Sequence, residues 1–310
     1  MKVIYGWQEN NRFNKPTGVG LGNFDGLHIG HMALINTLIS ESTLDYLDSI
    51  VYTFSKHPEN IIRKKLFTPL ITTVNKKVEL LGQTRLDYLY FDEFDETYSR
   101  IKPEVFVEDI LVKRLNMKLA VAGVDYRFGY KGQGDVSLLT ELGKEHNFRV
   151  VIIPPIKSGN DVVSSTLIRK YIAKGDMDKV FNLLGRHYSI TGKVEKGRRV
   201  GNTLGFPTAN IYPESYLVLP DRGVYISKTL IGGRLYNSLT NIGNNPTFTD
   251  CKNISVETHI LDFEEDIYGS SIEVFFIFKI REEEKFDSVN ELIIQMEKDV
   301  LKAREYFKLR

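Results

Sequence analysis

The 310-residue sequence has one cysteine, Cys251. A single cysteine excludes an internal disulfide and any metal site built from several cysteines. A reducing compartment suits such a chain, so we expect a cytoplasmic protein. No apolar run is long enough to span a bilayer, and the first residues, MKVIYGWQENNR, lack the pattern of a signal peptide. We therefore expect no membrane partner.

An excess of charge of one sign is also missing. The 41 Lys and Arg residues against 40 Asp and Glu give a net charge of +1. Residues 1–184 carry +2 and residues 185–310 carry −1. A non-specific grip on nucleic acid requires a basic surface, so these values argue against nucleic acid as a partner. With 10 prolines and 24 glycines, collagen-like and low-complexity chains are excluded, which leaves a globular protein.

The first part of the chain alternates β-rich runs with segments of helical apolar spacing. This alternation predicts an α/β fold with a parallel, Rossmann-like sheet and crossover helices. A further helix is expected over residues 166–184, with Gly185 as its stop. The expected strands are 17–23, 49–54, 86–91, 118–122 and 149–154, and the other expected helices are 30–40, 74–81 and 103–115.

After Gly185 the pattern changes to short β-rich runs separated by Gly, Asn, Pro or Asp. Such runs without helices between them predict a closed antiparallel barrel. Residues 288–307 predict a terminal helix with an apolar face toward the barrel. The chain is too long for one core, so we expect two domains, 1–184 and 185–310. The expected barrel strands are 187–195, 206–211, 224–230, 235–242, 254–262 and 272–280.

The densest chemical motif is GNFDGLHIGH at residues 22–31. A strand ends at glycine and a helix begins near Gly30, which presents backbone N–H groups and a positive helix end to an anion. His28 and His31 are three residues apart and share a helix face, from which both can donate to phosphate. Gly26 and Gly30 would let the phosphate approach the backbone. An isolated histidine pair is most often solvated or half a zinc site, but no cysteine cluster supports zinc here. The candidate phosphate-binding residues are Gly22, Asn23 and Gly30, with His28 and His31 as catalytic donors.

This motif resembles the nucleotidyltransferase signature, in which two histidines of a His-x-Gly-His element stabilise ATP phosphates during attack at the α-phosphorus. The stretch SSTLIR at 164–169 resembles the companion motif of that superfamily. Alone it would be a helix cap with a surface arginine. Together with the first motif it indicates a second phosphate clamp, because arginine binds phosphate oxygens bidentately. The resemblance implies Ser165, Thr166 and Arg169 as nucleotide-binding residues.

The glycine-rich stretch GVDYRFGYKGQGD spans residues 123–135. By itself it predicts a flexible surface loop. It resembles the flavin-and-nucleotide loop of the bacterial FAD synthetase family, and Thr53–Pro58 (TFSKHP) is similar to that family's element after the second strand. This resemblance implies flavin contacts at Asp125, Tyr126 and Phe128.

A second site is predicted at residues 192–210, GKVEKGRRVGNTLGFPTAN. Glycine-rich backbone can wrap phosphates through its N–H groups, although the glycines alone equally suit a β-hairpin with a polar turn. Thr208 and Asn210 alternate, so on an extended segment both side chains point to one face. Hydroxyl and amide oxygens are hard ligands suited to Mg²⁺ held jointly with ATP phosphates. The candidate phosphate-binding glycines are Gly192, Gly197, Gly201 and Gly205.

The full string resembles the riboflavin kinase signature, and further similar stretches follow at 223–225, 241–248, 256–261, 266–269 and 281–287. A lone glutamate in a β-rich run more often lies on a solvated face. We nevertheless expect Glu257, in VETHIL, to face the barrel interior beside Thr258 and His259, and the resemblance implies it as the general base. It implies Arg281 and Phe286 as flavin contacts.

Over its whole length the chain resembles the bifunctional prokaryotic riboflavin kinase/FAD synthetase family. That resemblance implies phosphorylation of riboflavin to FMN by the barrel, then adenylylation of FMN to FAD with release of pyrophosphate by the first domain. ATP is the implied co-substrate and Mg²⁺ the implied cofactor. Two alternatives stay open. In the first, the first domain transfers AMP to another phosphorylated acceptor. In the second, the barrel binds oligonucleotides, but the net charge of −1 over residues 185–310 argues against this. Weak homo-oligomerisation is also left open.

Overall fold

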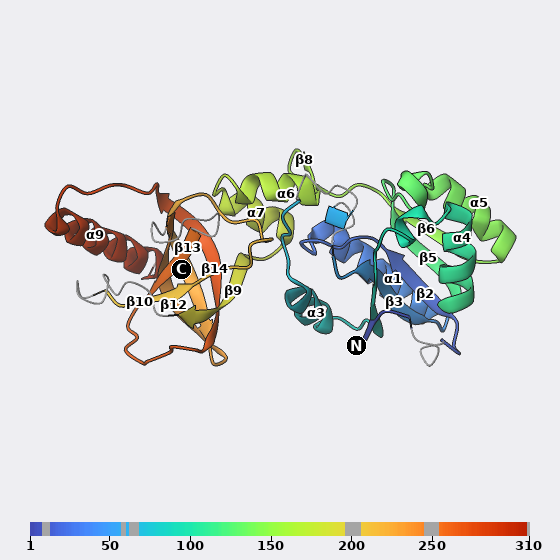
Figure 1. Ribbon diagram of the computed structural model, residues 1–310, viewed down its shortest axis with the longest axis horizontal. Coiled ribbons are helices and arrows are strands. Elements are labelled where there is room, and N and C mark those ends of the chain that lie inside the picture. Colours follow the sequence, from blue (N-terminus) through green and yellow to red (C-terminus); the bar gives the residue numbers. More distant parts are fainter. Residues whose placement is uncertain (8–12, 57–59, 62–67, 196–205, 245–253, 309–310) are drawn as a thin grey trace. The chain divides into compact units, whose positions relative to one another are not determined.

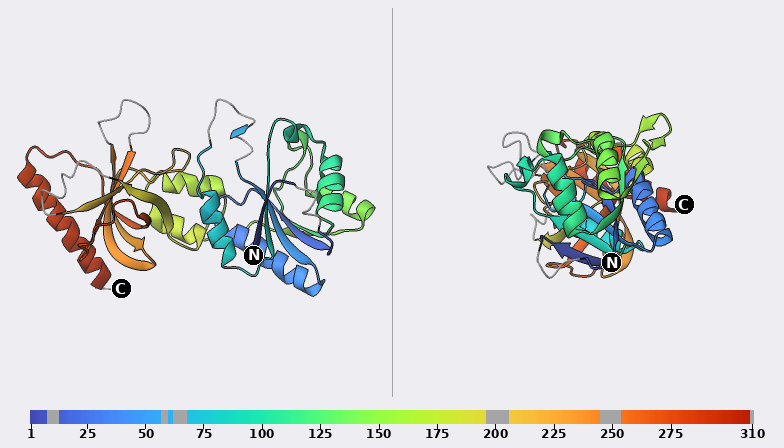
Figure 2. Two further views of the ribbon diagram at one scale, coloured as in Figure 1. Left: turned by 60° about the horizontal axis from the view of Figure 1, so that its bottom comes forward. Right: turned by 90° about the vertical axis from the view of Figure 1, so that its right-hand side faces the viewer.

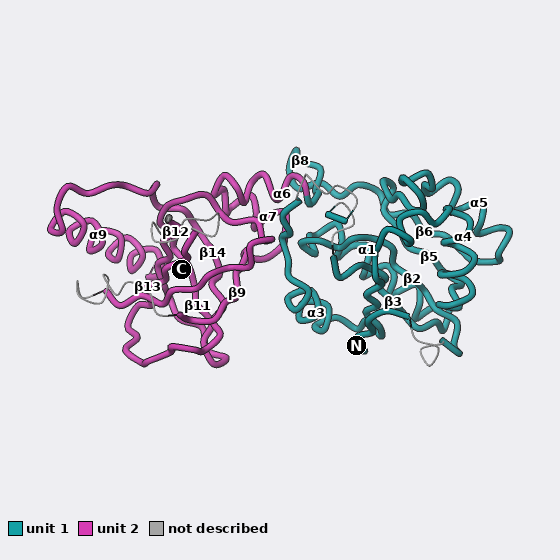
Figure 3. Tube along the Cα trace, viewed as in Figure 1, with its two compact units in different colours: residues 1–165 teal, residues 166–310 magenta. Residues whose placement is uncertain are grey.

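The computed structural model describes residues 1–7, 13–56, 60–61, 68–195, 206–244 and 254–308. These form two compact units, residues 1–165 and 166–310 (Figure 3). A functional boundary at 184/185 stays a prediction, since compactness alone does not assign an activity to residues 166–184.

The first unit contains a six-stranded parallel sheet in the order β1-β4-β3-β2-β5-β6 (Figure 1). This confirms the predicted fold of the first part of the chain. The edge strand β1 was not predicted, because four residues are too few to display a pattern. The strands are β1 (Lys2–Tyr5), β2 (Thr17–Leu21), β3 (Asp48–Phe54), β4 (Tyr88–Asp92), β5 (Met117–Gly123) and β6 (Arg149–Ile153).

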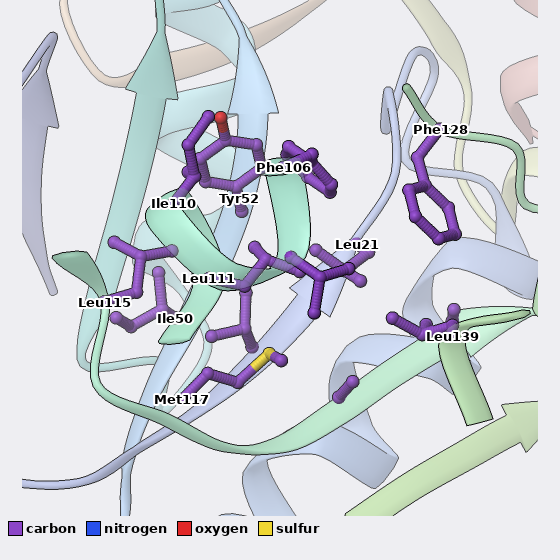
Figure 4. Close-up of a cluster of buried hydrophobic side chains, with 14 of the residues drawn as sticks. Leu21, Ile50, Tyr52, Phe106, Ile110, Leu111, Leu115, Met117, Phe128 and Leu139 are labelled. Atoms are coloured by element: carbon purple, nitrogen blue, oxygen red, sulfur yellow. The ribbon is translucent and has the colours of Figure 1, made fainter. Parts of the chain in front are cut away.

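Helices cover both faces of this sheet (Figure 1, Figure 2). Helices α1 (Ile29–Leu44) and α3 (Val74–Gly82) pack on the face to which Val51 points. The opposite face is covered by η3 (Phe106–Arg114) and α5 (Val136–His146). Because strand side chains alternate, Ile50 and Tyr52 point to this second face, where Figure 4 shows them with Phe106, Ile110 and Leu111.

Two predicted helices differ in detail. The expected helix over 103–115 consists of α4 (Pro103–Val105) and the π-helix η3, in which the Leu115 N–H donates to the Ile110 carbonyl five residues earlier at 3.1 Å. The expected single helix over 166–184 is wrong. It is broken into α6 (Ser165–Ile172) and α7 (Met177–Leu184) because Gly175 adopts a φ of +71°. The remaining short elements are η2 (Tyr98–Arg100), η4 (Tyr130–Gly132), β7 (Lys157–Ser158) and β8 (Asp161–Val162).

The second unit is a closed antiparallel barrel in the order β10-β13-β12-β11-β14-β9, which confirms the predicted barrel. The terminal helix α9 (Val289–Lys308) packs on the outer face of β11 and β12, against Val224, Ile226 and Leu239. Helix α7 contacts β9 and β14. The strands are β9 (Tyr188–Glu195), β10 (Thr208–Ile211), β11 (Gly223–Ile231), β12 (Arg234–Asn244), β13 (Ile254–Ile260) and β14 (Ser271–Arg281).

Side-chain hydroxyls fill much of the barrel interior. Ser227 lies 2.8 Å from the Ser238 hydroxyl and 2.7 Å from that of Thr240, and Thr240 lies 3.0 Å from that of Thr258. Thr229 joins the same network through Ser238 at 2.8 Å. All five side chains are fully buried. We call this network the hydroxyl ladder. Since every buried hydroxyl in it has a partner, the polar interior carries no large desolvation penalty.

Candidate active sites

The predicted phosphate loop of the first unit connects β2 to α1. His28 is the N-cap of α1, and its Nδ1 accepts the backbone N–H of His31 at 3.1 Å. A ring nitrogen that accepts has no proton, so the ring proton of neutral His28 is on Nε2. Nε2 is therefore the nitrogen of His28 that can donate to a phosphate oxygen.

The two histidines of the loop lie together. Their rings stack with centroids 3.6 Å apart and an interplanar angle of 13°, and the Phe24 ring lies edge-on to His31 at 5.3 Å. The spacing of three residues thus brings the pair to one place at the start of α1, as expected. Their catalytic role stays a prediction.

The loop glycines make room for the protein's own side chains. A Cβ on Gly30 would lie 3.2 Å from the His28 ring, and one on Gly22 would lie 3.2 Å from the Phe24 ring. Gly26 has a φ of +88°, and its Cβ would lie 3.0 Å from Ile71. The interpretation that Gly26 and Gly30 leave space for a phosphate is therefore incomplete, because neighbouring side chains take that space.

Strained backbone in the loop is held by hydrogen bonds to residues outside the loop. Phe24 and Leu27 have φ values of +48° and +43°, which are unfavourable for residues with a Cβ. The buried carboxylate of Asp25 accepts the backbone N–H groups of Ile71 at 3.0 Å and Thr72 at 3.1 Å. Ser165 donates its hydroxyl to the Asp25 carbonyl at 2.9 Å, so the structure brings this predicted residue to the loop. Thr166 and Arg169 follow on α6, in the second compact unit.

The sequence did not single out Lys77, which also contacts the loop. Its Nζ donates to the Asn23 carbonyl at 2.9 Å and to the Thr53 hydroxyl at 3.3 Å. The Thr53 hydroxyl donates to the same carbonyl at 3.0 Å. Burial lowers the pKa of Lys77 to about 8, against the raising effect of the negative charge of Asp25. One feature of the sequence could have indicated a buried lysine: Lys77 lies among the apolar positions Val74, Val78 and Leu81 of one helix.

An aromatic cluster lies next to the loop cavity. Phe54 lines a small cavity with Asn23, Asp25 and Lys77, and its ring contacts those of Phe94 and Tyr98 with centroids 5.2 and 5.4 Å apart. The Tyr98 hydroxyl lies 2.6 Å from that of Tyr52, which in turn donates to Asp92. Burial raises the pKa of Asp92. Phe54 could have been predicted from the sequence, because it belongs to the stretch Thr53–Pro58 that resembles a family element. Residues 53–56 of that stretch are described.

The predicted flavin residues of this unit have different environments. Tyr126 stacks on Phe128 with centroids 5.7 Å apart, and Asp125 is exposed. Phe128 is only 5% exposed and packs on Phe106 in the core (Figure 4). The burial of Phe128 gives it a structural role, and the flavin contacts of all three residues stay predictions.

In the second unit, a cavity of about 360 Å³ is lined by several predicted residues: Thr208, Glu257, Arg281 and Phe286. Residues of α9, among them Met296 and Asp299, also line it, so the cavity lies between the outer wall of the barrel and this helix. The expectation that Glu257 faces the barrel interior is wrong. Strand residues alternate, and the fully buried Thr258 takes the inward position.

The strand register brings the predicted metal ligands next to Glu257. Asn210 lies opposite Glu257, and Thr208 lies opposite His259 on the same face of the barrel. The Asn210 Nδ2 donates to the Thr208 carbonyl at 3.4 Å, so the amide oxygen is the end that can bind a cation. Within the described ranges no group of three or more His, Cys, Asp or Glu side chains could hold a metal ion.

A second cavity of about 200 Å³ adjoins the same strand. It is lined by Thr208 and Asn210 from β10 and by acidic residues 264–266. Thr208 thus lines both cavities. Gly192 lies in β9, where a Cβ would be 2.9 Å from Ile211, and Gly197, Gly201 and Gly205 lie outside the described residues.

Arg281 is held in the larger cavity by α9. Its Nε donates to Asp299 Oδ2 at 2.9 Å, and both side chains of this ion pair are largely buried, with 15% and 6% exposure. Gln295 Nε2 donates to the other Asp299 oxygen at 3.0 Å. The guanidinium carbon also lies 5.8 Å from the centre of the Phe286 ring. Asp299 therefore orients a cavity residue without being part of any predicted motif.

Comparisons with known proteins agree along the whole chain. Residues 10–167 match the family model of FAD synthetase, and residues 184–307 match that of riboflavin kinase. A bifunctional riboflavin kinase/FMN adenylyltransferase of Buchnera aphidicola is 34% identical over 312 residues and covers 100% of both chains. The proteins of that name from Haemophilus influenzae and Listeria monocytogenes are 34% and 36% identical and cover 99% of this chain, and 99% and 98% of their own. The chain belongs to the bifunctional riboflavin kinase/FMN adenylyltransferase family.

Both predicted sites fall within the residues that match the family. The histidine loop and Ser165 lie in the part matched by FAD synthetase, and Glu257 with its cavity lies in the part matched by riboflavin kinase. Arg169 falls just beyond the first matched range.

A crystal structure described as a macrolide-efflux protein from Streptococcus pneumoniae has a TM-score of 0.88 at 28% identity, and the match covers 98% of this chain and 99% of that one. It supports the fold of the family member described here. Among the helices within the described ranges, none has the length and apolarity needed to cross a membrane.

Proposed function

We propose that the chain makes FAD from riboflavin in two ATP-dependent steps. The barrel phosphorylates riboflavin to FMN, and the sheet domain joins FMN to AMP with release of pyrophosphate. The observation that carries this proposal is the pair of family models, FAD synthetase and then riboflavin kinase, each over a part that contains a predicted phosphate site. We assign residues 1–184 to the adenylyltransferase and 185–310 to the kinase, supported by a kinase match that starts at residue 184.

The test of this function is incubation of the pure protein with riboflavin, ATP and Mg²⁺, with FMN and FAD resolved by chromatography. Both products are expected. FMN without FAD, together with no binding of FMN, would favour another phosphorylated acceptor for the first domain. A filter-binding assay with an oligonucleotide at moderate salt is expected to show no binding, and binding there would favour an oligonucleotide-binding barrel. We place the protein in the cytoplasm on the strength of its single cysteine.

In the kinase reaction, riboflavin occupies the larger cavity beside Glu257, Arg281 and Phe286. Glu257 accepts the proton of the ribityl 5′-hydroxyl as that oxygen attacks the γ-phosphorus of ATP in line. The bond from the γ-phosphorus to the β,γ-bridging oxygen breaks, and ADP leaves. The Ser255 hydroxyl donates to Glu257 Oε1 at 3.2 Å and so helps to orient the carboxylate. The ATP phosphates lie toward the smaller cavity, and Thr208 stands where the two cavities meet. Gly192, Gly197, Gly201 and Gly205 stay predicted nucleotide contacts, the last three outside the described residues.

Thr208 and Asn210 fit Mg²⁺ because a hydroxyl and an amide oxygen are hard donors. When bound, the ion neutralises charge on the ATP phosphates. Thr208→Ala and Asn210→Ala should each raise the Mg²⁺ concentration needed for half-maximal riboflavin phosphorylation. Titration of Mg²⁺ in the kinase assay checks this, with the FMN-to-FAD rate of each variant as control. An unchanged titration with a slower rate would assign these residues to flavin binding or to structure.

In the adenylyl transfer, the nucleophile is the phosphate of FMN, which is ionised near neutral pH and needs no general base. Catalysis then depends on position and charge stabilisation. His28 and His31 donate to the ATP phosphates at the start of α1. The flavin ring packs at the aromatic cluster of Phe54, Phe94 and Tyr98. Asp125, Tyr126 and Phe128 are further flavin contacts. The other nucleotide contacts are Gly22, Asn23, Gly30, Ser165, Thr166 and Arg169.

Asp299→Asn should weaken the binding of riboflavin. The change removes the charge that holds Arg281, and a hydrogen bond to a charged group contributes enough for KM of riboflavin to rise by about tenfold. Steady-state kinetics at saturating ATP measures this. The matched control is Asp262→Asn. It removes the charge of an exposed ion-pair partner of Arg304, and Arg304 lies on α9 as Asp299 does. Equal KM values for the two variants would contradict the role of Asp299.

A further inference from the structure

The phosphate loop is fixed at two successive points by contacts from distant parts of the first unit. The Asn23 carbonyl receives hydrogen bonds from Lys77 and Thr53, and the Asp25 carbonyl receives one from Ser165. A peptide unit is planar, so a fixed carbonyl also fixes the N–H of the next residue, which points the opposite way. The N–H directions of Phe24 and Gly26 are therefore set from outside the loop.

A lysine is a costly choice for one of these contacts. The side chain of Lys77 is buried, with 6% exposure of the residue, and desolvation of an ammonium group is unfavourable. An apolar residue such as methionine would fill the same space on α3 without that penalty. The contact with the Asn23 carbonyl is therefore the feature that sets lysine apart at this position.

Neighbouring groups partly offset the effect of burial on the ammonium group of Lys77. The Asp25 carboxylate is the negative group that acts on it, and the face of the Phe91 ring of β4 lies 5.7 Å from its Nζ. Lys56 lines the same cavity and Thr53 of β3 is a neutral partner. On α3 itself, the neighbouring Lys76 pairs with Glu79 at 2.7 Å.

We propose that Lys77 is a positioning residue for adenylyl transfer: its ammonium group holds the Asn23 peptide so that the strained loop keeps the shape that binds the pyrophosphate part of ATP. This inference rests on the proposed function. Lys77 acts through the Asn23 carbonyl, and Thr53 supports the same carbonyl from β3. Loss of Lys77 relaxes Phe24 toward a favourable φ and spoils the pyrophosphate site. The ring contacts of Phe54 with Phe94 and Tyr98 do not involve Lys77 and are kept.

The reverse reaction isolates this site. In it an oxygen of pyrophosphate attacks the AMP phosphorus of FAD, the bond between the two phosphates of FAD breaks, and FMN leaves as ATP forms. The kinase does not use pyrophosphate, so KM for pyrophosphate reports on the adenylyl-transfer site, to which the phosphate loop belongs. KM also does not depend on how much of the enzyme is folded, which separates positioning from a general loss of stability.

We expect Lys77→Met to raise KM for pyrophosphate by about tenfold or more, with KM for FAD changed by less than about twofold. Thr53→Val, which removes the second donor to the Asn23 carbonyl at nearly constant volume, should raise it by a smaller factor. Lys76→Met is the matched control, because it changes the adjacent lysine of α3, and its KM values should equal those of the wild type. FMN release from FAD, followed by fluorescence, measures all four proteins.

A wild-type KM for pyrophosphate in Lys77→Met, with only a lower melting temperature, would overturn the inference and leave Lys77 a structural residue. Should Lys77→Met fail to fold, an unchanged KM in Thr53→Val would overturn it as well. Wild-type protein that makes no FAD and shows no pyrophosphate-dependent release of FMN would overturn the proposed function itself, and the inference with it.

Discussion

The Glu257→Gln variant is expected to phosphorylate riboflavin about 10²–10⁴ times more slowly than the wild type, the usual effect of losing a general base. An alcohol keeps its proton until it attacks, so the ribityl hydroxyl needs a carboxylate within hydrogen-bond reach. Glu257 lines the cavity between the barrel wall and α9, together with Thr208, where the proposed mechanism requires a base. Glutamine is nearly isosteric and keeps one oxygen acceptor, so the fold and the proposed metal ligands Thr208 and Asn210 should be preserved.

The measurement is turnover of Glu257→Gln at saturating riboflavin and ATP, with its conversion of FMN to FAD as an internal control. The second reaction should stay at the wild-type rate, because its nucleophile is already ionised. Wild-type kinase turnover would remove Glu257 from the mechanism. Loss of both reactions would indicate misfolding.

The second large effect is expected from His31→Ala, which should slow FAD formation from FMN by about 10²–10³-fold. Loss of one preorganised hydrogen-bond donor to a charge in the transition state typically has an effect of this size. His31 stacks on His28 and contacts Phe24, so its loss also removes the stacking partner of the ring that caps α1. Riboflavin phosphorylation should be unchanged, because Glu257 and its cavity belong to the other compact unit.

Both reactions of His31→Ala are to be measured on protein whose fold is checked by circular dichroism. His146→Ala, at the last turn of α5, is the matched histidine control and should leave both reactions at wild-type rates. An equal loss of the two activities in a folded His31→Ala protein would contradict two separate sites.

The sheet, the barrel and the neighbourhood of the histidine pair could be predicted because each depends on local pattern. Alternating β-rich and helical segments predict parallel strands, and a spacing of three puts His28 and His31 together. Lys77 could not be found this way, because its partner Asn23 lies 54 residues away and only the fold brings them together. The sequence also could not show that a Cβ on Gly30 would meet the His28 ring.

The dependence on partners far away in the sequence also explains why the orientation of Glu257 was predicted wrongly. In an alternating strand, the sequence VETHIL permits either face to point inward, and a threonine suits a barrel interior only when other hydroxyls meet it there. Thr240 and Ser227, which supply those partners, belong to other strands.

The hydroxyl ladder of the barrel therefore has a consequence for how the chain folds. If β13 paired one residue out of step with β12, Thr258 would turn outward and the Glu257 carboxylate would enter the barrel, where it would be a desolvated charge among hydroxyls. A slip by two residues would keep the faces but separate Thr240 from Thr258. The hydrogen bonds of the hydroxyl ladder therefore stabilise only the correct strand register, and they do so inside the barrel, away from any ligand. The hydroxyl ladder thus selects the register of the strands. A chain whose barrel has closed already has Thr208, Asn210 and Glu257 on one outer face before it binds a substrate.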